Sequence, residues 1–409
     1  MGLLDSETPG RLWILTEVYY PEQISTGYYM TSIAEGLAAS REVIVLTGQP
    51  KHMSRGLVAA KRELRRRVEI IRTRGTTLNK NVFLYRLINM LTIGISTFCQ
   101  SVKRFRRGDH VLVVTAPPTL PVTTAAAALL RGASFTLLVQ DSYPEILIAV
   151  GAVKMDSSFV SIVNFFNRWV YKYASNIIVM GRDMNQLFLK KTAGLDVPVV
   201  TIPNWADLES VHPTPRANNE LLNELGIADK FIFMYAGNIG HPTDVETIIE
   251  CSAKLLDRTE FHFVFIGDGA KKKWLEAAVQ ERSLTNVTIL DYRPRQEQIV
   301  FLNACDVGLV ALINGMWGTA MPSRTYNIMA AGKPILALTD DGSELAQVID
   351  EEKIGWHISP GDPDRLLEAI LCIYDERNAL AEMGNRARTA ALEKYSRSLA
   401  IESYGRALS

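Results

Sequence analysis

The chain alternates short apolar segments with longer helical segments, and it does so in two consecutive sets. The first set has candidate strands at residues 11–16, 42–47, 111–115, 134–140, 176–180 and 199–202, with a candidate helix near 27–39. The second set has candidate strands at 231–236, 261–266, 287–290, 307–312, 335–338 and 356–358. Strands that alternate with helices pair in parallel, with the helices covering both faces of the sheet. The pattern therefore predicts an α/β fold with two doubly wound units.

A proline-rich stretch separates the two sets. Residues 203–220 contain three prolines among polar residues, a composition typical of a linker. A chain of 409 residues is long for one domain and sufficient for two of roughly 200 residues each. We predict a first domain at 1–203, a second domain at 204–390 and a final helix at 391–409.

Composition limits the partners and the compartment. The net charge is +0, so the molecule as a whole does not attract nucleic acid, and any basic surface must be local. The four cysteines follow no metal or disulfide spacing, and their apolar surroundings predict buried free thiols in a reducing cytoplasm. The chain does not start with a basic segment followed by an apolar one, so we expect no signal peptide.

The segment Met321–Ala337 has the composition of a loop, a short helix and a strand. Pro322 suits the first turn of a helix, and Gly332 suits its end. Backbone N–H groups at the start of this helix, beside Ser323 and Arg324, would bind a phosphate. An ordinary connection between a helix and a strand would show the same pattern.

This segment resembles the donor-site signature of family 4 glycosyltransferases, enzymes with the GT-B fold of two facing Rossmann-like domains. The match is nearest to bacterial members that build O-antigen, capsule or exopolysaccharide. Other segments follow in the family's order: TEVYYPEQISTGYY at 16–29, QDSYPE at 140–145, TIPNWAD at 201–207, YAGNIG at 235–240 and FIGDGAKKKWLE at 265–276. The resemblance spans nearly the whole chain and implies a GT-B fold whose C-terminal helix crosses back to the first domain.

The resemblance also implies where a nucleotide-sugar donor binds, namely at the carboxyl edge of the second sheet. Gly237 and Gly240 would let backbone N–H groups approach a diphosphate, although glycines of a tight turn would look the same. Arg293 would lie in the segment that frames the base. The implied donor-binding residues are Gly27, Gly237, Asn238, Gly240, Gly267, Asp268, Arg293, Ser323, Arg324, Asn327 and Glu344.

The sequence departs from the family at two positions. Many members carry two glutamates eight residues apart, which help hold the sugar and the ribose, but Thr319 and Asn327 stand at those positions here. Asn327 would still hydrogen-bond a ribose hydroxyl, and Arg324 and Ser323 become the strongest phosphate candidates. Glu344 is a further candidate for ribose or sugar, and it equally suits the first turn of a helix.

The first domain supplies the acceptor side of the implied site. The loop Ser25–Gly27 resembles the glycine-containing loop that faces the donor phosphates. Asp141 follows an apolar strand and is a candidate catalytic residue, together with Arg324; it would position the acceptor or help to remove its proton, while a structural capping role is the alternative. Lys51 and His52 are candidate acceptor contacts.

Two basic runs flank an apolar segment in the first domain. Lys61–Arg67 and Lys103–Arg107 are basic, and Val82–Val102 between them has Arg86 as its one charged residue. Such a pattern suits an anionic membrane surface, which attracts each Lys or Arg by roughly 1 kcal/mol. It also fits a helix packed in the domain core beside a solvated basic loop. We expect peripheral contact with the cytoplasmic leaflet of the inner membrane through about residues 61–107, and no nucleic-acid partner.

The resemblance implies a retaining glycosyl transfer that needs no metal cofactor. The Asp-x-Asp element at 362–364 reads more simply as a helix start than as a metal site. UDP is the nucleotide expected from family frequency, GDP is an alternative, and the acceptor implied is an undecaprenyl-diphosphate-linked glycan. Two other functions stay open: a nucleotide-sugar 2-epimerase on the same fold, and a non-catalytic nucleotide-binding subunit, which the missing glutamate pair makes plausible.

Overall fold

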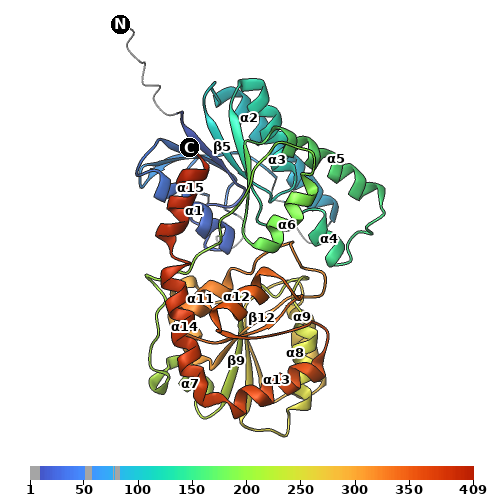
Figure 1. Cartoon of the computed structure of the whole chain (residues 1–409), viewed down its shortest axis with the longest axis vertical. Helices are drawn as coiled ribbons and strands as arrows, with labels where there is room; N and C mark the ends of the chain where they lie inside the picture. The colour runs from blue at the N-terminus through green and yellow to red at the C-terminus, as the bar shows by residue number, and fades with distance from the viewer. Residues whose placement is uncertain (1–9, 51–57, 77, 79–82) are drawn as a thin grey trace.

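The computed structural model describes residues 10–50, 58–76, 78 and 83–409. The chain forms two lobes stacked along its longest axis, and each lobe is a sheet covered by helices (Figure 1). The strands of the first lobe are β1 Leu12–Leu15, β2 Val43–Thr47, β3 Arg62–Arg65, β4 Val68–Arg72, β5 His110–Val114, β6 Ser134–Leu138, β7 Asn176–Val179 and β8 Val199–Thr201. Its helices are α1 Ser25–Leu37, α2 Phe83–Arg104, α3 Thr119–Arg131, α4 Glu145–Ala149, α5 Ser158–Tyr173 and α6 Arg182–Lys191.

The second lobe follows the same scheme. Its strands are β9 Phe231–Ala236, β10 Phe261–Ile266, β11 Val287–Leu290, β12 Val307–Ala311, β13 Ile335–Leu338 and β14 Gly355–Ile358. Its helices are α7 Glu220–Leu225, α8 Val245–Lys254, α9 Lys272–Glu281, α10 Gln298–Ala304, α11 Arg324–Ala330, α12 Glu344–Glu352, α13 Pro363–Asp375 and α14 Leu380–Glu393, and α15 Arg397–Ala407 ends the chain. Three short 3₁₀ turns lie at Arg216–Asn218, Arg295–Glu297 and Arg377–Ala379.

Both sheets are built mainly from parallel strands, and their central strands are buried on both faces. The strand order is β3-β4-β2-β1-β5-β6-β7-β8 in the first lobe and β11-β10-β9-β12-β13-β14 in the second. Every pair is parallel except β3 with β4. All four residues of β1 are at most 1% exposed, as expected for a strand that is covered by helices on both sides. The predicted pair of parallel α/β units is confirmed.

The hairpin of β3 and β4 was not predicted, because its first strand lies within the basic run at residues 61–67. Arg66 and Arg67 form its turn with φ of 44° and 68°, the left-handed conformation that two-residue hairpin turns require. Strand β3 lies at the edge of the sheet. Charged side chains on an edge strand oppose pairing with a second chain, which explains why a strand here is so basic.

The connection between the lobes is packed rather than exposed. Trp205 and Val211 are fully buried, although the segment has the prolines of a linker. The Tyr29 hydroxyl of α1 donates to the Trp205 carbonyl over 3.0 Å, and the two rings meet edge to face at 4.7 Å. This segment therefore fastens the second lobe to the first.

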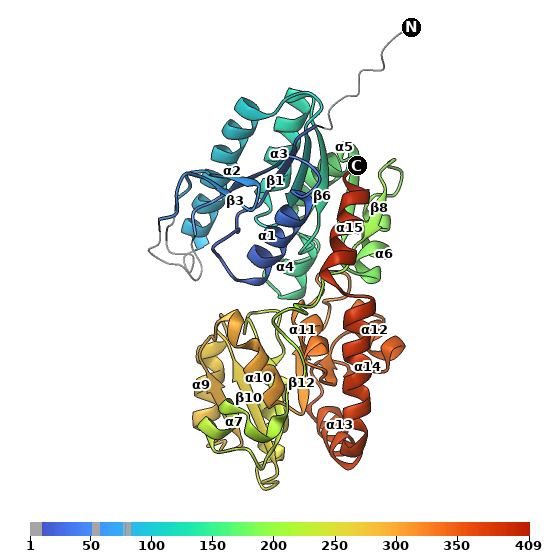
Figure 2. The ribbon, with the colours of Figure 1, turned by 90° about the vertical axis from the view of Figure 1, so that its left-hand side faces the viewer.

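The chain returns to the first lobe at its end, as predicted. Figures 1 and 2 both show α14 along the second lobe and the C-terminus beside the first. Helix α15 packs on α1, where Gly36 faces the side chain of Ile401. Arg41 donates to the Leu408 carbonyl over 2.8 Å, which fixes the last turn to the first lobe.

The cysteines agree with the prediction only in part. All four are free, and Cys251 and Cys305 are buried, but Cys99 and Cys372 are exposed. Cys99 lies on α2 and Cys372 on α13, helices that present one side to solvent, so an apolar neighbourhood in sequence did not ensure burial. In the described part of the chain, no helix combines the length and apolar character needed to cross a bilayer.

The close contact between α14 and the end of α11 gives a test of how α14 packs on the second lobe. A Cβ atom added at Gly384 would lie 2.1 Å from the Gly332 carbonyl oxygen, which belongs to the backbone and cannot rotate away. We expect Gly384→Ala to lower the free energy of unfolding by about 1–3 kcal/mol. Alanine is otherwise the better helix former by about 0.5–1 kcal/mol, so a loss of stability can come only from the clash. Chemical denaturation measures this, with Asn385→Ala, at an exposed position of the same helix, as the control.

Candidate functional site

Two glycine loops meet at the carboxyl edge of the second sheet, after β9 and β10. Gly237, Gly267 and Gly269 have φ of 148°, 153° and 156°, a conformation essentially restricted to glycine. A Cβ atom at Gly267 would lie 1.9 Å from the Gly237 carbonyl oxygen, and the Ile239 N–H donates to the Asp268 carbonyl over 2.9 Å. The loops are therefore packed backbone to backbone, and the predicted Gly237 and Gly267 lie side by side.

The remaining residues of these loops are less constrained. Gly240 is buried against the amide of Asn238, where an added Cβ atom would lie 2.8 Å from the Asn238 nitrogen. Asp268 is exposed, and its carboxylate accepts the Gly269 N–H over 2.8 Å. The structure thus gathers the predicted loop residues at one edge of the sheet, while their contact with a diphosphate stays a prediction.

Arg324, the first residue of α11, extends over the first glycine loop. Its guanidinium carbon lies 4.0 Å from the centre of the Tyr235 ring, and its Nη2 donates to the Asn238 carbonyl over 3.4 Å. A Cβ atom at Gly237 would lie 2.9 Å from that guanidinium carbon, so glycine is what admits the arginine. Its Nη1 is buried and has no hydrogen-bond partner among the described residues. A buried, unpaired cationic N–H beside two glycine loops is suited to an anion such as a phosphate.

The predicted loop of the first lobe faces this arginine. The hydroxyls of Ser25 and Ser323 lie 2.7 Å apart, which joins the start of α1 to the residue before Arg324. Gly27 is packed so closely that a Cβ atom would lie 2.4 Å from the Glu22 carbonyl oxygen. The structure thus places this loop beside the start of α11, while its contact with donor phosphates stays a prediction.

The two positions that lack the family's glutamates are occupied by structural side chains. Thr319 is 1% exposed, and its hydroxyl donates to the Met316 carbonyl over 2.7 Å. Asn327 is buried as well: its oxygen accepts the Asp207 N–H over 3.0 Å, and its amide donates to Gln298 over 3.1 Å. The amide of Asn327 thus joins the interlobe segment to α10, and its contact with a ribose stays a prediction.

Glu344 and Arg293 are engaged in ion pairs. The Glu344 carboxylate accepts the backbone N–H of Arg182 over 2.6 Å and its Nε over 2.9 Å, so it links α12 to α6 across the lobes. The hydrogen bond that Arg182 donates to Glu351 is the main cause that raises the pKa of Arg182, and the pairing with Glu344 raises it further. Arg293 pairs with Glu224 at 3.2 Å. A donor role for either residue stays a prediction and would require these pairs to open or to share the ligand.

Arg295, two residues after Arg293, was missed by the sequence analysis. Its guanidinium lies 3.5 Å from the ring centre of Tyr28 in the first lobe, and its Nε donates to Asp207 over 3.1 Å. Its Nη2 is buried and unpaired among the described residues. Arg293 and Arg295 lie in the same short segment, so the sequence alone does not separate them. The contact with Tyr28 shows that Arg295 is the one that faces the first lobe.

Asp141 follows β6 at the edge of the first sheet and lines a small pocket beneath α5 with Tyr143, Asn167 and Tyr171. Burial raises the pKa of its carboxyl from 3.8 to about 6. Its backbone carbonyl accepts the Thr115 hydroxyl over 2.9 Å. No hydrogen bond of the carboxylate itself occurs within the described residues, so the side chain is not a helix cap there. A carboxyl with a pKa near 6 is suited to hold or exchange a proton at neutral pH.

Next to this loop, the lobes are joined again. The Ser142 N–H donates to the Thr319 carbonyl over 2.8 Å, and the Ser142 hydroxyl donates to Glu145 over 2.7 Å. The Asp141 loop is thereby tied to the segment that leads into α11. The loop after Asp141 and the segment before Arg324 thus both lie at the junction of the lobes.

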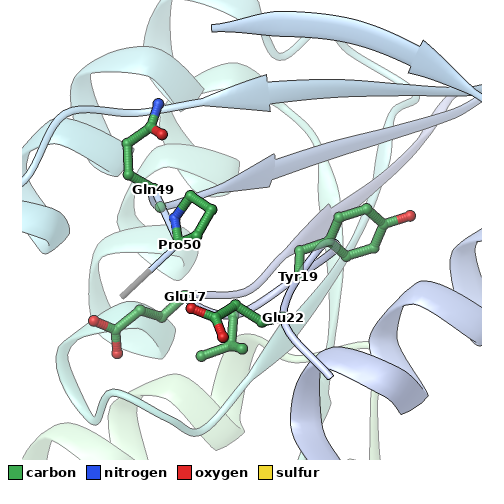
Figure 3. A pocket seen from close by; sticks show the side chains of 7 residues that line it. Glu17, Tyr19, Glu22, Gln49 and Pro50 are labelled. Atoms are coloured by element: carbon green, nitrogen blue, oxygen red, sulfur yellow. The ribbon is translucent and has the colours of Figure 1, made fainter. Parts of the chain in front are cut away.

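A second pocket opens at the carboxyl ends of β1 and β2. It is lined by Glu17, Val18, Tyr19, Glu22, Gly48, Gln49 and Pro50. Figure 3 shows Gln49 above the pocket and Glu17 and Glu22 below it. Neither carboxylate was singled out from the sequence, although both lie in the segment 16–29 that carries the family resemblance. The predicted acceptor contacts Lys51 and His52 lie outside the described residues.

Known proteins resemble the chain in sequence and fold. Residues 218–390 match the family model described as glycosyl transferases group 1. The chain is 34% identical over 323 residues to the probable glycosyltransferase WbjE of Pseudomonas aeruginosa, a match that covers 78% of each chain. It is 25% identical over 345 residues to the putative colanic acid biosynthesis glycosyl transferase WcaI of Escherichia coli (strain K12), covering 81% of this chain and 84% of the relative.

A solved structure shares the fold over nearly its full length. Anabaena HepE in complex with UDP-glucose superposes with a TM-score of 0.72 at 13% identity, covering 97% of this chain and 99% of that one. At this identity the likeness concerns the fold alone, and it confirms the predicted GT-B arrangement of two facing domains.

The unpaired N–H of Arg324 gives a binding test. We expect Arg324→Ala to weaken the binding of a nucleoside diphosphate by about 1.5–3 kcal/mol, or roughly 10- to 150-fold in Kd, because a charge-assisted hydrogen bond is lost. Isothermal titration calorimetry measures this. Arg377→Ala is the matched control, since Arg377 also lies over a tyrosine ring, at 4.4 Å, and donates to a carbonyl in the same lobe. Equal weakening in both variants would contradict the assignment.

The raised pKa of Asp141 predicts a pH-dependent stability. Because the folded-state pKa of about 6 exceeds the ordinary value of 3.8, folding favours the protonated carboxyl, and its contribution is lost as the pH rises from about 4 through 6. The amide introduced by Asp141→Asn stays neutral throughout this range. The melting temperature of Asp141→Asn should therefore rise relative to the wild type between pH 4 and 7 and then stay level. A constant difference, or the same trend in Asp156→Asn at an exposed position, would contradict the burial of this charge.

Proposed function

Because the chain belongs to the group 1 glycosyl transferase family, we propose that it transfers a sugar from a nucleotide-diphosphate sugar to a lipid-linked glycan in the biosynthesis of a cell-surface polysaccharide. The observation that carries this proposal is the buried Nη1 of Arg324, which has no partner in the described part of the chain and lies beside the Gly237 loop, at a junction to which both lobes contribute. The name of the WcaI relative, which refers to colanic acid, supports a polysaccharide product. HepE, which binds UDP-glucose, supports a UDP-sugar donor.

The donor would bind mainly through the second lobe. Its diphosphate would accept hydrogen bonds from Arg324, from Ser323 and from the backbone of the loop at Gly237. These donors are fixed before the reaction begins: the guanidinium is held on the Tyr235 ring, and the loop is held by its packing against Gly267. Preorganised donors stabilise the negative charge that develops on the leaving diphosphate, and such electrostatic stabilisation is usually the largest catalytic contribution. The proposed transfer therefore requires no metal cofactor.

The transfer itself would proceed with retention at the anomeric carbon. An acceptor hydroxyl attacks from the face that the nucleotide leaves. The bond from its oxygen to the anomeric carbon forms as the bond from that carbon to the phosphate oxygen breaks, and the hydroxyl proton passes to the departing phosphate. Asp141 would orient the acceptor and stabilise the proton during this transfer, a role that its pKa of about 6 permits.

Contacts across the junction would limit hydrolysis of the donor. The hydrogen bonds between Ser25 and Ser323 and between Ser142 and Thr319 close the space between the lobes around the candidate site. Exclusion of water from such a site strengthens its electrostatic interactions and favours transfer to the acceptor over transfer to water.

The finer specificity follows from the family resemblance. We propose a hexosyl or N-acetylhexosaminyl donor and an undecaprenyl-diphosphate-linked acceptor. An acceptor of this kind lies in the membrane, so we also propose a cytoplasmic protein with peripheral contact to the inner leaflet. The charge pattern of the sequence predicts that this membrane contact is made by about residues 61–107.

A donor panel tests the proposed function. We expect one nucleotide, with UDP first, to raise the melting temperature clearly above the others, because a ligand of the native state stabilises it by RT ln(1 + [L]/Kd). The matching sugar conjugate should then label a lipid-linked glycan in the presence of EDTA. Proton NMR of the product should show the anomeric configuration of the donor.

Other outcomes of this panel identify the competing functions. Epimerisation of the sugar at C2 without any acceptor would indicate an epimerase. Nucleotide binding with neither transfer nor hydrolysis for any donor would indicate a non-catalytic subunit, which the engaged side chains of Thr319 and Asn327 would then explain. A folded protein that binds no nucleotide would contradict the proposal.

A further inference from the structure

We infer that the outer face of α5 docks the protein on an anionic lipid surface, an inference that rests on the proposed use of a lipid-linked acceptor. Helix α5 is apolar on two sides. Its inner side packs into the first lobe, where Val160, Val170 and Tyr171 are buried. Its outer side carries a second apolar stripe that no described part of the chain covers.

The outer stripe follows the helical period. Its members recur at spacings of three and four residues, which places them on one face of the helix: Phe159, Ile162, Phe166, Trp169 and Tyr173. All except Trp169 are 43–56% exposed, and Phe165 beside them is 70% exposed. Exposed apolar patches of this kind mark interaction sites, because a monomeric soluble protein gains nothing from them.

The charge around the stripe identifies the partner. Helix α3 contacts both α2 and α5, so the three helices form one continuous layer (Figure 1). This layer contains no aspartate or glutamate, although the chain as a whole has 44 acidic and 44 basic residues. Its basic residues with described side chains are Lys103, Arg104, Arg131, Arg168 and Lys172. An apolar stripe within a purely cationic layer matches a bilayer surface that contains anionic lipids.

A second copy of the chain fits this face less well. The spacing of the stripe would suit pairing with another α5, as in a coiled coil. Such pairing would bring Arg168 and Lys172 of both copies together, and α5 contains no acidic residue to neutralise them. Lipid phosphates, by contrast, supply the missing negative charge while acyl chains cover the aromatic side chains.

The inner side of α5 connects this face to the candidate acceptor site. Asn167 donates to the Tyr143 carbonyl over 2.8 Å, and Lys191 donates to the same carbonyl over 3.2 Å. Asn167 also lines the pocket that contains Asp141. A glycan whose lipid anchor lies in the bilayer would therefore reach the first lobe beside the Asp141 pocket.

The basic run predicted for membrane contact is less suited to it. In the hairpin, Arg62 pairs with Glu69 at 2.6 Å, and Arg65 and Arg66 pair with Glu35 at 2.9 and 3.1 Å. Carboxylates thus already neutralise much of this run. Helix α2, from the same predicted region, belongs to the cationic layer and exposes Ile95.

Vesicle flotation tests the assignment without any donor or acceptor. The wild-type protein should bind vesicles of phosphatidylglycerol mixed with phosphatidylcholine and should not bind phosphatidylcholine alone. The double variant Ile162→Ser with Phe166→Ser should bind at least about tenfold more weakly, because the buried apolar area is lost. Arg168→Glu with Lys172→Glu should lose at least about as much, since each Lys or Arg near the surface contributes about fivefold. Ile162 and Phe166 are exposed, so the melting temperature of the serine variant should stay unchanged, whereas Arg168→Glu also removes the hydrogen bonds from Arg168 to the Ala193 carbonyl and should lower it slightly.

Matched controls make the result decisive. Trp274→Ser with Lys273→Glu changes an exposed aromatic and a cation on α9 of the other lobe and should bind vesicles normally. Leu91→Ser with Ile95→Ser tests α2.

The inference is overturned if the wild type binds no vesicles, if the α5 variants bind as the wild type does, or if the α5 variants only convert a dimer into a monomer. Nucleotide binding, measured separately, shows whether the proposed function fails independently of the docking face.

Discussion

The candidate donor site depends on the close packing of two loops whose backbones touch. Gly267 approaches the Gly237 carbonyl so closely that any side chain would collide with it, and Gly237 in turn admits the guanidinium of Arg324. The arginine is held on the Tyr235 ring, with one N–H left unpaired among the described residues. A larger residue in either loop would displace the other loop and the arginine with it. The glycine that allows the two loops to pack together is therefore also the one that leaves room for the guanidinium of Arg324.

The two lobes are joined both by buried apolar packing and by polar contacts around the candidate site. Buried Trp205 and the docking of α15 on α1 hold the lobes through apolar packing. Around the site, the contacts are single hydrogen bonds between small groups, as at Ser25 with Ser323, and the ion pair of Arg182 with Glu344. A single hydrogen bond between two hydroxyls costs little to replace with water or ligand, whereas the apolar packing and the partly buried Arg182–Glu344 pair cost more to break. This division suits lobes that must admit a donor and still remain together.

The sequence predicted the elements whose signal is local and missed those whose signal is spatial. The strands at 231–236, 261–266 and 335–338 were predicted with their observed bounds, because each is an apolar run ended by a turn. Strand β3 was missed because its charges, which protect a sheet edge, conceal the strand pattern. The proximity of Gly237 and Arg324 could be predicted, because both lie at the carboxyl edge of one sheet. The ion pair of Glu344 could not be predicted, because its partner Arg182 belongs to the other lobe.

A net charge of zero conceals a strong separation of charge. The basic hairpin residues are matched by carboxylates on neighbouring elements, as Arg65 is by Glu35, but the layer of α2, α3 and α5 contains no acidic residue at all. The second lobe, with the Arg324 site, lies at the far side of the junction from this layer (Figure 1). If α5 rests on lipid, a soluble nucleotide sugar can reach the Gly237 loop from the aqueous side while a membrane-held acceptor reaches Asp141. The asymmetry of charge then becomes the feature that orients the two substrates toward each other.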